Sequence, residues 1–302
     1  MKNRKHTVVG IGEILWDMLP GGKKLGGAPA NFAYHAGELG AEAYIISSVG
    51  NDKPGNEIIE TLNSLGVSSR YIQVDKNHPT GSVEVKLKAD GIPSYIIHKN
   101  VAWDYIYLDK ACLELAQKAD AICFGSLSQR SEISGNTILE ILSNTKGQCI
   151  KVFDINIRQN FYNKEIICNS LKYADVLKLN EEELPIILNL LEIEDSQAIS
   201  STKEILQRLA EEYSMKLIAL TRGEKGSFLL SGNESSNHSG FQVKVVDTVG
   251  AGDAFTAAVV VGLLNKMDLG SINDFANRVG SYVCTQEGGT PPNISKFAVY
   301  NL

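Results

Sequence analysis

The chain has 302 residues, of which 43% are hydrophobic, and its formal net charge is −6. This length suits one large α/β domain with an attachment, or two smaller domains. The acidic balance, without a cluster of lysines and arginines, argues against nucleic acid or an anionic membrane as the main partner, and the longest apolar runs are far too short to span a membrane.

Short apolar runs recur along the chain and alternate with amphipathic stretches such as NEIIETLNSLG at 56–66 and KEILQRLAEEY at 203–213. Near-continuous apolar strands that alternate with helices predict a mostly parallel central sheet with helices on both faces. The runs are TVVGIG at 7–12, AYIISSVG at 43–50, AICFGS at 121–126, IKVFDIN at 150–156, VLKLN at 176–180 and LIALTRG at 217–223.

The first run is followed at once by Glu13, so it is interpreted as a strand rather than as a signal peptide. The five cysteines are scattered and odd in number, which favours reduced thiols and a cytoplasmic protein.

One region breaks the alternation of strand and helix. GSVEVKLK at 81–88 alternates strictly between apolar and polar residues, and PSYIIHKNVAWDYI follows after a turn. Strict alternation is typical of a half-solvated antiparallel pair. We predict a small projecting β-sheet lid from residues 13–25 and 81–106, on a main domain of residues 1–12, 26–80 and 107–302.

The segment DTVGAGDAF at 247–255 precedes a mostly apolar helical run. The first turn of a helix has free N–H groups, and Gly250, Ala251 and Gly252 would let an anion approach them closely. Asp253 beside a transferring phosphoryl group would serve as a general base. The alternative is a purely structural role, in which the loop is a helix N-terminus with a capping aspartate. No P-loop pattern occurs, and GIGEIL at 10–15 does not fit a dinucleotide-binding motif.

A second loop, LGGAPANFAYHAGELGAEAYIISSVG at 25–50, resembles the N-terminal signature of the ribokinase-like (PfkB-type) carbohydrate kinases, and DTVGAGDAFTAAVV resembles their C-terminal signature. The resemblance runs from about Gly10 to Pro292. GEILWDMLPGGKKLGGAPANFA is most similar to fructokinases.

The resemblance implies an ATP-dependent kinase of a sugar primary hydroxyl, converting D-fructose to fructose 6-phosphate with Mg²⁺ and K⁺. It also implies a homodimer formed through the lid. Kinases of 2-keto-3-deoxygluconate, ribose or a nucleoside remain open alternatives, as does an inactive sugar-sensing protein.

The resemblance also assigns the expected sugar site. Asp17 and Asn31 would bind sugar hydroxyls, and Gly26 and Gly27 would bring the backbone close to the sugar. Asn156 follows an apolar strand at the expected ligand edge. Trp103 would either cover the sugar ring or anchor the lid. Arg158 would hold the phosphoryl group, with a surface ion pair as its alternative.

For the nucleotide and the ions, the resemblance implies three sets of residues. Asn180 and Glu183 match an N-x-x-E motif that organises Mg²⁺ through water. The nucleotide loop would be Thr221, Gly223 and Gly226, with Asn277 lining the adenine pocket. The K⁺ site would take Asp247, Val249, Cys284 and Gly289.

Overall fold

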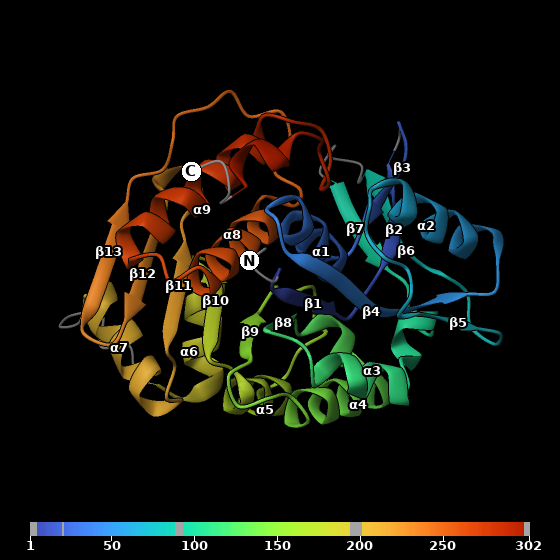
Figure 1. Cartoon of the computed structure of the whole chain (residues 1–302), viewed down its shortest axis with the longest axis horizontal. Helices are drawn as coiled ribbons and strands as arrows, with labels where there is room; N and C mark the ends of the chain where they lie inside the picture. Colours follow the sequence, from blue (N-terminus) through green and yellow to red (C-terminus); the bar gives the residue numbers. More distant parts are fainter. Residues whose placement is uncertain (1–4, 20, 88–92, 194–200, 299–302) are drawn as a thin grey trace.

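The computed structural model describes residues 5–19, 21–87, 93–193 and 201–298. Nine strands form the large sheet in the order β13-β12-β11-β10-β9-β8-β1-β4-β5 (Figure 1). All neighbours are parallel except β11–β12 and β12–β13, which confirms the predicted mostly parallel sheet. The strands are β1 (Thr7–Ile11), β4 (Glu42–Gly50), β5 (Ile72–Asp75), β8 (Ala121–Phe124), β9 (Ile150–Asp154), β10 (Val176–Asn180), β11 (Leu217–Thr221), β12 (Ser227–Ser231) and β13 (Glu234–His238).

Helices cover both faces of this sheet, as predicted (Figure 1). Successive strand residues point to opposite faces, so Val8 belongs to one buried core and Val9 to the other. The first core lies under α1 (Ala28–Glu38), α2 (Lys53–Ser64), α8 (Ala251–Leu264) and α9 (Leu269–Cys284). The second lies under α3 (Lys110–Ala116), α4 (Glu132–Ser143), α5 (Lys164–Tyr173), α6 (Glu183–Leu191) and α7 (Thr202–Glu212).

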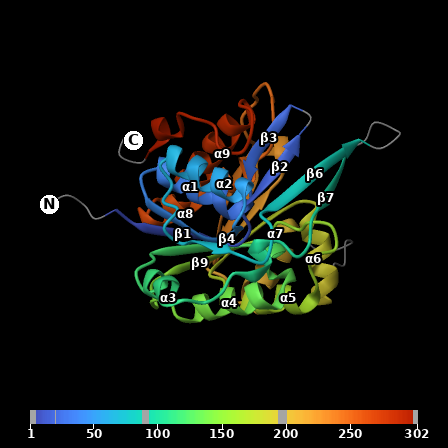
Figure 2. The ribbon, with the colours of Figure 1, turned by 90° about the vertical axis from the view of Figure 1, so that its right-hand side faces the viewer.

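A second sheet of order β3-β2-β6-β7 projects from the main body (Figure 2). We call this sheet the lid; its strands are β2 (Leu15–Leu19), β3 (Gly22–Gly26), β6 (Gly81–Leu87) and β7 (Pro93–Ile97). The two hairpins are joined by parallel pairing of β2 with β6. The chain leaves the sheet after Ile97, and the short 3₁₀ helix η1 (Ala102–Tyr105) lies in the main body beside β4 and α4.

The parallel strands place their carboxyl ends at one edge of the sheet. Loops at this edge meet the N-termini of α1 and α8, which pack against each other. No helix within the described ranges is long and apolar enough to cross a membrane. The edge next to the lid is therefore the place to examine for a site.

Candidate active site

The N-terminus of α8 presents unused backbone donors. Its N-cap, Gly250, has a φ of 77°, and a Cβ there would lie 2.6 Å from the Gly289 Cα. Both the left-handed backbone and this contact require glycine. Ala251 donates its N–H to the Thr248 carbonyl over 3.3 Å, whereas the N–H groups of Gly250 and Gly252 have no partner among the described residues. Free N–H groups at a helix start suit the binding of an anion.

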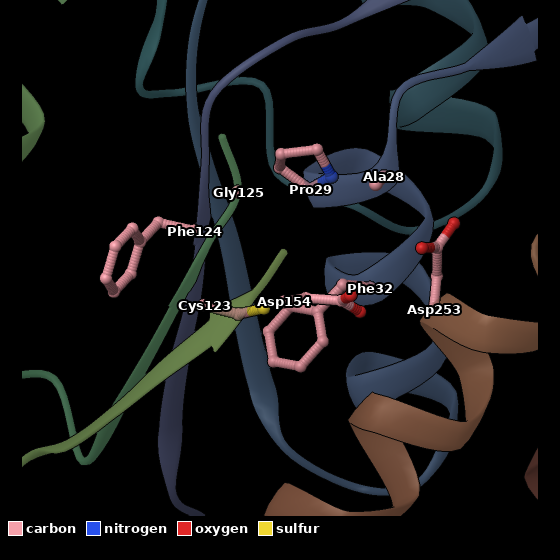
Figure 3. A pocket seen from close by; sticks show the side chains of 8 residues that line it. All are labelled: Ala28, Pro29, Phe32, Cys123, Phe124, Gly125, Asp154 and Asp253. Carbon is pink, nitrogen blue, oxygen red and sulfur yellow. The ribbon is translucent and has the colours of Figure 1, made fainter. Parts of the chain in front are cut away.

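Asp253 follows in the first turn of α8 and faces α1 across a small recess (Figure 3). Asn31, on α1, donates its side-chain N–H to Asp253 Oδ2 over 2.8 Å. Burial, together with the negative charge of Asp154, raises the pKa of Asp253 to about 6. The carboxylate is therefore more basic than an ordinary aspartate and still ionised at neutral pH, as a general base must be.

A buried ion pair lies beneath this helix start. Lys178, in the middle of β10, donates to Asp154 Oδ1 over 3.0 Å, and the Thr256 hydroxyl lies 2.8 Å from Asp154 Oδ2. Lys178 Nζ is 3.1 Å from the position that a Cβ on Gly252 would take. A cation thus lies beside the Gly252 backbone at this helix start.

Sequence reasoning missed Lys178. The signal was available, because a lysine in the apolar strand VLKLN must be paired when the strand is buried. Burial lowers the pKa of this ammonium, but the carboxylates of Asp154 and Glu183 more than offset that effect, so the net shift is upward. Lys178 is therefore a permanent positive charge.

The lid edge next to Asp253 carries acidic groups. A Cβ on Gly26 would lie 2.3 Å from Asp17 Oδ2, so the glycine makes room for this carboxylate. Burial raises the pKa of Asp17 to about 6. Gly27 has a φ of 108° and could not carry a Cβ, which would meet the Glu13 carbonyl at 2.4 Å.

Glu13 is a second acid that sequence reasoning left without a role. It is buried, and its Oε2 has no hydrogen-bond partner within the described part of the chain. Burial, the largest effect, raises its pKa to about 7, and the Asp253 charge contributes. The buried Oδ1 of Asn31 also lacks a partner among the described residues. Unpaired buried acceptors beside Asp253 suit a ligand rich in hydroxyl groups.

Arg158 is exposed on the segment between β9 and α5. Its charge lowers the pKa values of Asp17, Glu13 and Asp253, so it lies within electrostatic reach of all three. Asn156, two residues earlier, has a φ of 47°, an uncommon conformation outside glycine. The structure thus brings Arg158 to the acidic site, and the backbone around it is strained.

Asn180 and Glu183 bind each other's backbone at the start of α6. Asn180 Oδ1 accepts the N–H groups of Glu182 and Glu183, while Glu183 Oε2 accepts the Asn180 N–H. The other oxygen, Glu183 Oε1, accepts the Ile157 N–H over 3.0 Å. Both carboxylate oxygens are therefore partly used, which leaves Glu183 suited to ion contact through water rather than to direct ligation.

The nucleotide loop predicted at residues 221–226 lies between β11 and β12. Gly223 and Gly226 have φ values of 57° and 80°, and a Cβ on Gly226 would lie 2.2 Å from the His238 carbonyl. Thr221 donates to the Leu179 carbonyl. Asn277 is buried on α9, and its amide nitrogen donates to Ser227 and Asn273. Asn277 thus links α9 to the start of β12, next to the predicted nucleotide loop.

The residues predicted for a K⁺ site use most of their oxygens elsewhere. Asp247 accepts the N–H groups of Val249 and Gly288. The Cys284 carbonyl accepts the Val246 N–H, and the Gly289 carbonyl lies 2.9 Å from buried His35 Nε2. Within the described residues no group of three His, Cys, Asp or Glu side chains could hold a metal ion. The cation site stays a prediction.

Trp103 is fully buried in η1, outside the lid sheet. A ring without solvent access cannot cover a sugar in this conformation, so of its two predicted roles the structure leaves that of an anchor. The guanidinium of Arg130 lies over the ring, and the neighbouring Asp104 pairs with the same guanidinium.

The chain is similar to known proteins over nearly all of its length. A family model described as "pfkB family carbohydrate kinase" matches residues 21–296. The sugar kinase PH1459 of Pyrococcus horikoshii is 31% identical, over 93% of this chain and 91% of that protein. The fructokinase of Escherichia coli is 30% identical, over 92% of this chain and 93% of that one.

Solved structures agree with this fold. The crystal structure of PH1459 superposes with a TM-score of 0.82 at 30% identity, covering 96% of each chain. The ATP-bound fructokinase of Xylella fastidiosa gives a TM-score of 0.83 at 23% identity, covering 97% of each chain. At that identity the second likeness bears on the fold alone.

Proposed function

Because the chain belongs to the PfkB family of carbohydrate kinases, we propose that it transfers the γ-phosphoryl group of MgATP to the primary hydroxyl of D-fructose, giving fructose 6-phosphate. The single observation that carries the mechanism is the position of Asp253. Its carboxylate lies at a helix start with unused N–H groups, and it is held by Asn31 from the facing helix.

In the proposed reaction Asp253 takes the proton of the attacking hydroxyl. The sugar oxygen bonds to the γ-phosphorus as the bond to the ADP oxygen breaks, and the negative charge lies on the phosphoryl oxygens. The N–H groups of Gly250 and Gly252 would bind these oxygens, with the Lys178 ammonium behind them and Arg158 on the solvent side. Such preorganised charge stabilises the transition state without reorganisation.

Mg²⁺ bound with ATP would neutralise charge on the β- and γ-phosphates, and we assign the contact with its water shell to Glu183. Both Glu183 oxygens are anchored by backbone N–H groups, which fits a fixed outer-sphere role. For K⁺, the candidate oxygens of Asp247 and Gly289 already accept hydrogen bonds, and no step depends on them.

Fructose is favoured over 2-keto-3-deoxygluconate because a substrate carboxylate would need a cation that is not already engaged. Arg130 is paired with Asp104, Lys178 is paired with Asp154, and Arg158 is the cation assigned here to the phosphoryl group. The site instead offers acceptors for hydroxyl groups, Asp17 and Asn31. The fructokinase of Escherichia coli, 30% identical, supports the same choice.

The test is ADP release from MgATP in K⁺ buffer with fructose, ribose, 2-keto-3-deoxygluconate or adenosine supplied singly. Fructose-dependent release is the expected result. Release with another substrate only would contradict the choice of fructose and keep the kinase. Fructose binding by calorimetry without turnover would favour the sugar-sensing alternative.

We place the enzyme in the cytoplasm, since its five cysteines are free thiols.

We also propose a homodimer through the lid, because Met18 on β2 and Ile96 on β7 are 44% and 37% exposed. Apolar side chains on a small sheet with open edges are a liability unless covered.

A further inference from the structure

Arg130 is a buried cation outside the site described so far. It ends the short 3₁₀ helix η2 (Leu127–Arg130), and its side chain is 6% exposed. Its Nε and Nη2 donate to the two oxygens of Asp104 over 2.8 and 2.9 Å. Its Cζ lies 4.0 Å from the centre of the Trp103 ring and 4.6 Å from that of Phe161.

These contacts join three separate segments. Trp103 and Asp104 belong to η1, which follows the lid. The His98 carbonyl, which accepts a further N–H of Arg130 over 2.5 Å, comes directly after the last lid strand. Phe161 belongs to the segment 155–162, three residues after Arg158. The guanidinium of Arg130 therefore contacts both the chain that leaves the lid, at His98, and the segment 155–162 that contains Arg158.

The backbone of the segment around Arg158 needs contacts from other elements to keep its conformation. Asn156 and Gln159, on either side of Arg158, have φ values of 47° and 51°. Non-glycine residues persist in this region only where the surroundings determine their conformation. At one end the Ile157 N–H binds Glu183. At the other end Phe161 is held by its contact with Arg130 and by a turn bond to the Arg158 carbonyl.

A buried ion pair is a poor way to gain stability, because apolar replacements of similar volume are often as stable. The Nη1 of Arg130, which carries two N–H groups, has no partner in the described part of the chain. A planar guanidinium that donates several hydrogen bonds holds its neighbours in a defined geometry, which an apolar side chain does less well.

We propose that Arg130 is a positioning residue: by binding Asp104, the His98 carbonyl and the Phe161 ring together, it sets the place of Arg158 and couples it to the lid. This inference rests on the proposed function only for the role given to Arg158. It also explains why Trp103 is buried beside the lid's return rather than placed over the sugar.

The kinetic test is a double-mutant cycle between Phe161→Leu and Arg158→Met. Phe161→Leu removes the ring from the guanidinium without leaving a buried charge unpaired. It should lower kcat about tenfold, since displacements near 1 Å cost up to two orders of magnitude. In the Arg158→Met background the same change should cost less than about twofold. An equal cost in both backgrounds would overturn the proposal.

A control variant separates this effect from a general loss of packing. Phe297→Leu alters an aromatic ring on η4 (Ile294–Phe297) that also has a cation, Lys296, over it. It should leave kcat within about twofold of the wild type. A second variant, Arg130→Met with Asp104→Asn, removes both charges together and should lower kcat as Phe161→Leu does.

A readout without substrate keeps this inference separate from the proposed function. Trypsin cleavage after Arg158, followed by mass spectrometry in native buffer, should be about tenfold faster in Phe161→Leu and in the charge-free double variant than in Phe297→Leu. Equal cleavage rates would overturn the inference. Absence of kinase activity in the wild type would overturn the proposed function instead, and the cleavage rates would then decide this inference alone.

Discussion

Three charged residues, Asp253, Asp154 and Lys178, lie together at the start of α8, and the exposed Arg158 is within electrostatic reach of Asp253. Their charges act on one another through a poorly solvated region, so the protonation of Asp253 depends on its neighbours. At the scale of single residues, this coupling determines when the proposed base can accept a proton.

The first prediction concerns pH. The base acts in its ionised form, and the pKa of Asp253 is raised to about 6. We expect kcat/KM to fall tenfold per pH unit below about pH 6 and to level off above it. Asp154→Asn removes a charge that raises this pKa and frees Lys178, which lowers it, so the midpoint should move to lower pH. A midpoint unchanged in Asp154→Asn would contradict the coupling.

The second prediction concerns stability. Because the folded-state pKa of Asp253 lies above its ordinary value of 3.8, the folded protein loses stability as pH rises from about 4 through 6. Asp253→Asn removes this cost. Its urea midpoint should therefore equal or exceed that of the wild type at pH 8, and the difference should shrink at pH 4.5. A variant that is less stable at pH 8 would contradict the electrostatic account.

The third prediction concerns Lys178. Lys178→Met alone leaves Asp154 buried without its cation, so it should be strongly destabilised. The double variant Lys178→Met with Asp154→Asn should recover most of the stability, as judged by urea unfolding. If Lys178 stabilises the transferred group, the double variant should still show kcat lowered at least about a hundredfold. Recovery of kcat together with stability would assign Lys178 a purely structural role.

At the scale of elements, the sequence predicted most of what forms the site. Local sequence patterns predicted every parallel strand of the large sheet except β5, together with the lid hairpin at residues 81–97 and the glycine loop. The packing of Trp103 against Arg130 was not predicted, because these residues come from different segments and no local pattern pairs them. The same holds for Glu183 and the Ile157 N–H, which meet only across neighbouring strands.

The glycine loop itself gives the fourth prediction. Gly250→Ala introduces a Cβ within 2.6 Å of Gly289 at a φ of 77°. We expect a loss of about 1–3 kcal/mol in the free energy of unfolding and a larger loss of kcat, because the helix start must shift. Gly66→Ala is the matched control, with a φ of 73° and no atom within 4 Å of the added Cβ. It should lose stability alone, and equal activity losses in both variants would contradict the account.

At the scale of the whole molecule, the lid contributes both to the proposed sugar site and to the proposed dimer contact. Asp17 on β2 and Gly26 on β3 contact each other in the lid sheet and are assigned to the sugar site. Met18 on β2 and Ile96 on β7 are exposed on the same sheet. Closure of such an element over a substrate would exclude water, which otherwise competes as phosphoryl acceptor.

The fifth prediction concerns this assembly. We expect light scattering after gel filtration to give twice the mass of the 32.9 kDa chain. Met18→Glu with Ile96→Glu should shift the mass to that of one chain, because two carboxylates would be buried in an apolar contact. A monomeric wild type, or a dimer insensitive to both changes, would rule out pairing through the lid.

The most direct test of the central claim is rapid-quench transfer of labelled phosphate from ATP to fructose by wild-type protein and by Asp253→Asn at pH 8. We predict fructose 6-phosphate from the wild type, and a transfer rate at least about a thousandfold lower in the variant with ATP affinity unchanged. Transfer in the variant within tenfold of the wild type would contradict the role of Asp253 as the base.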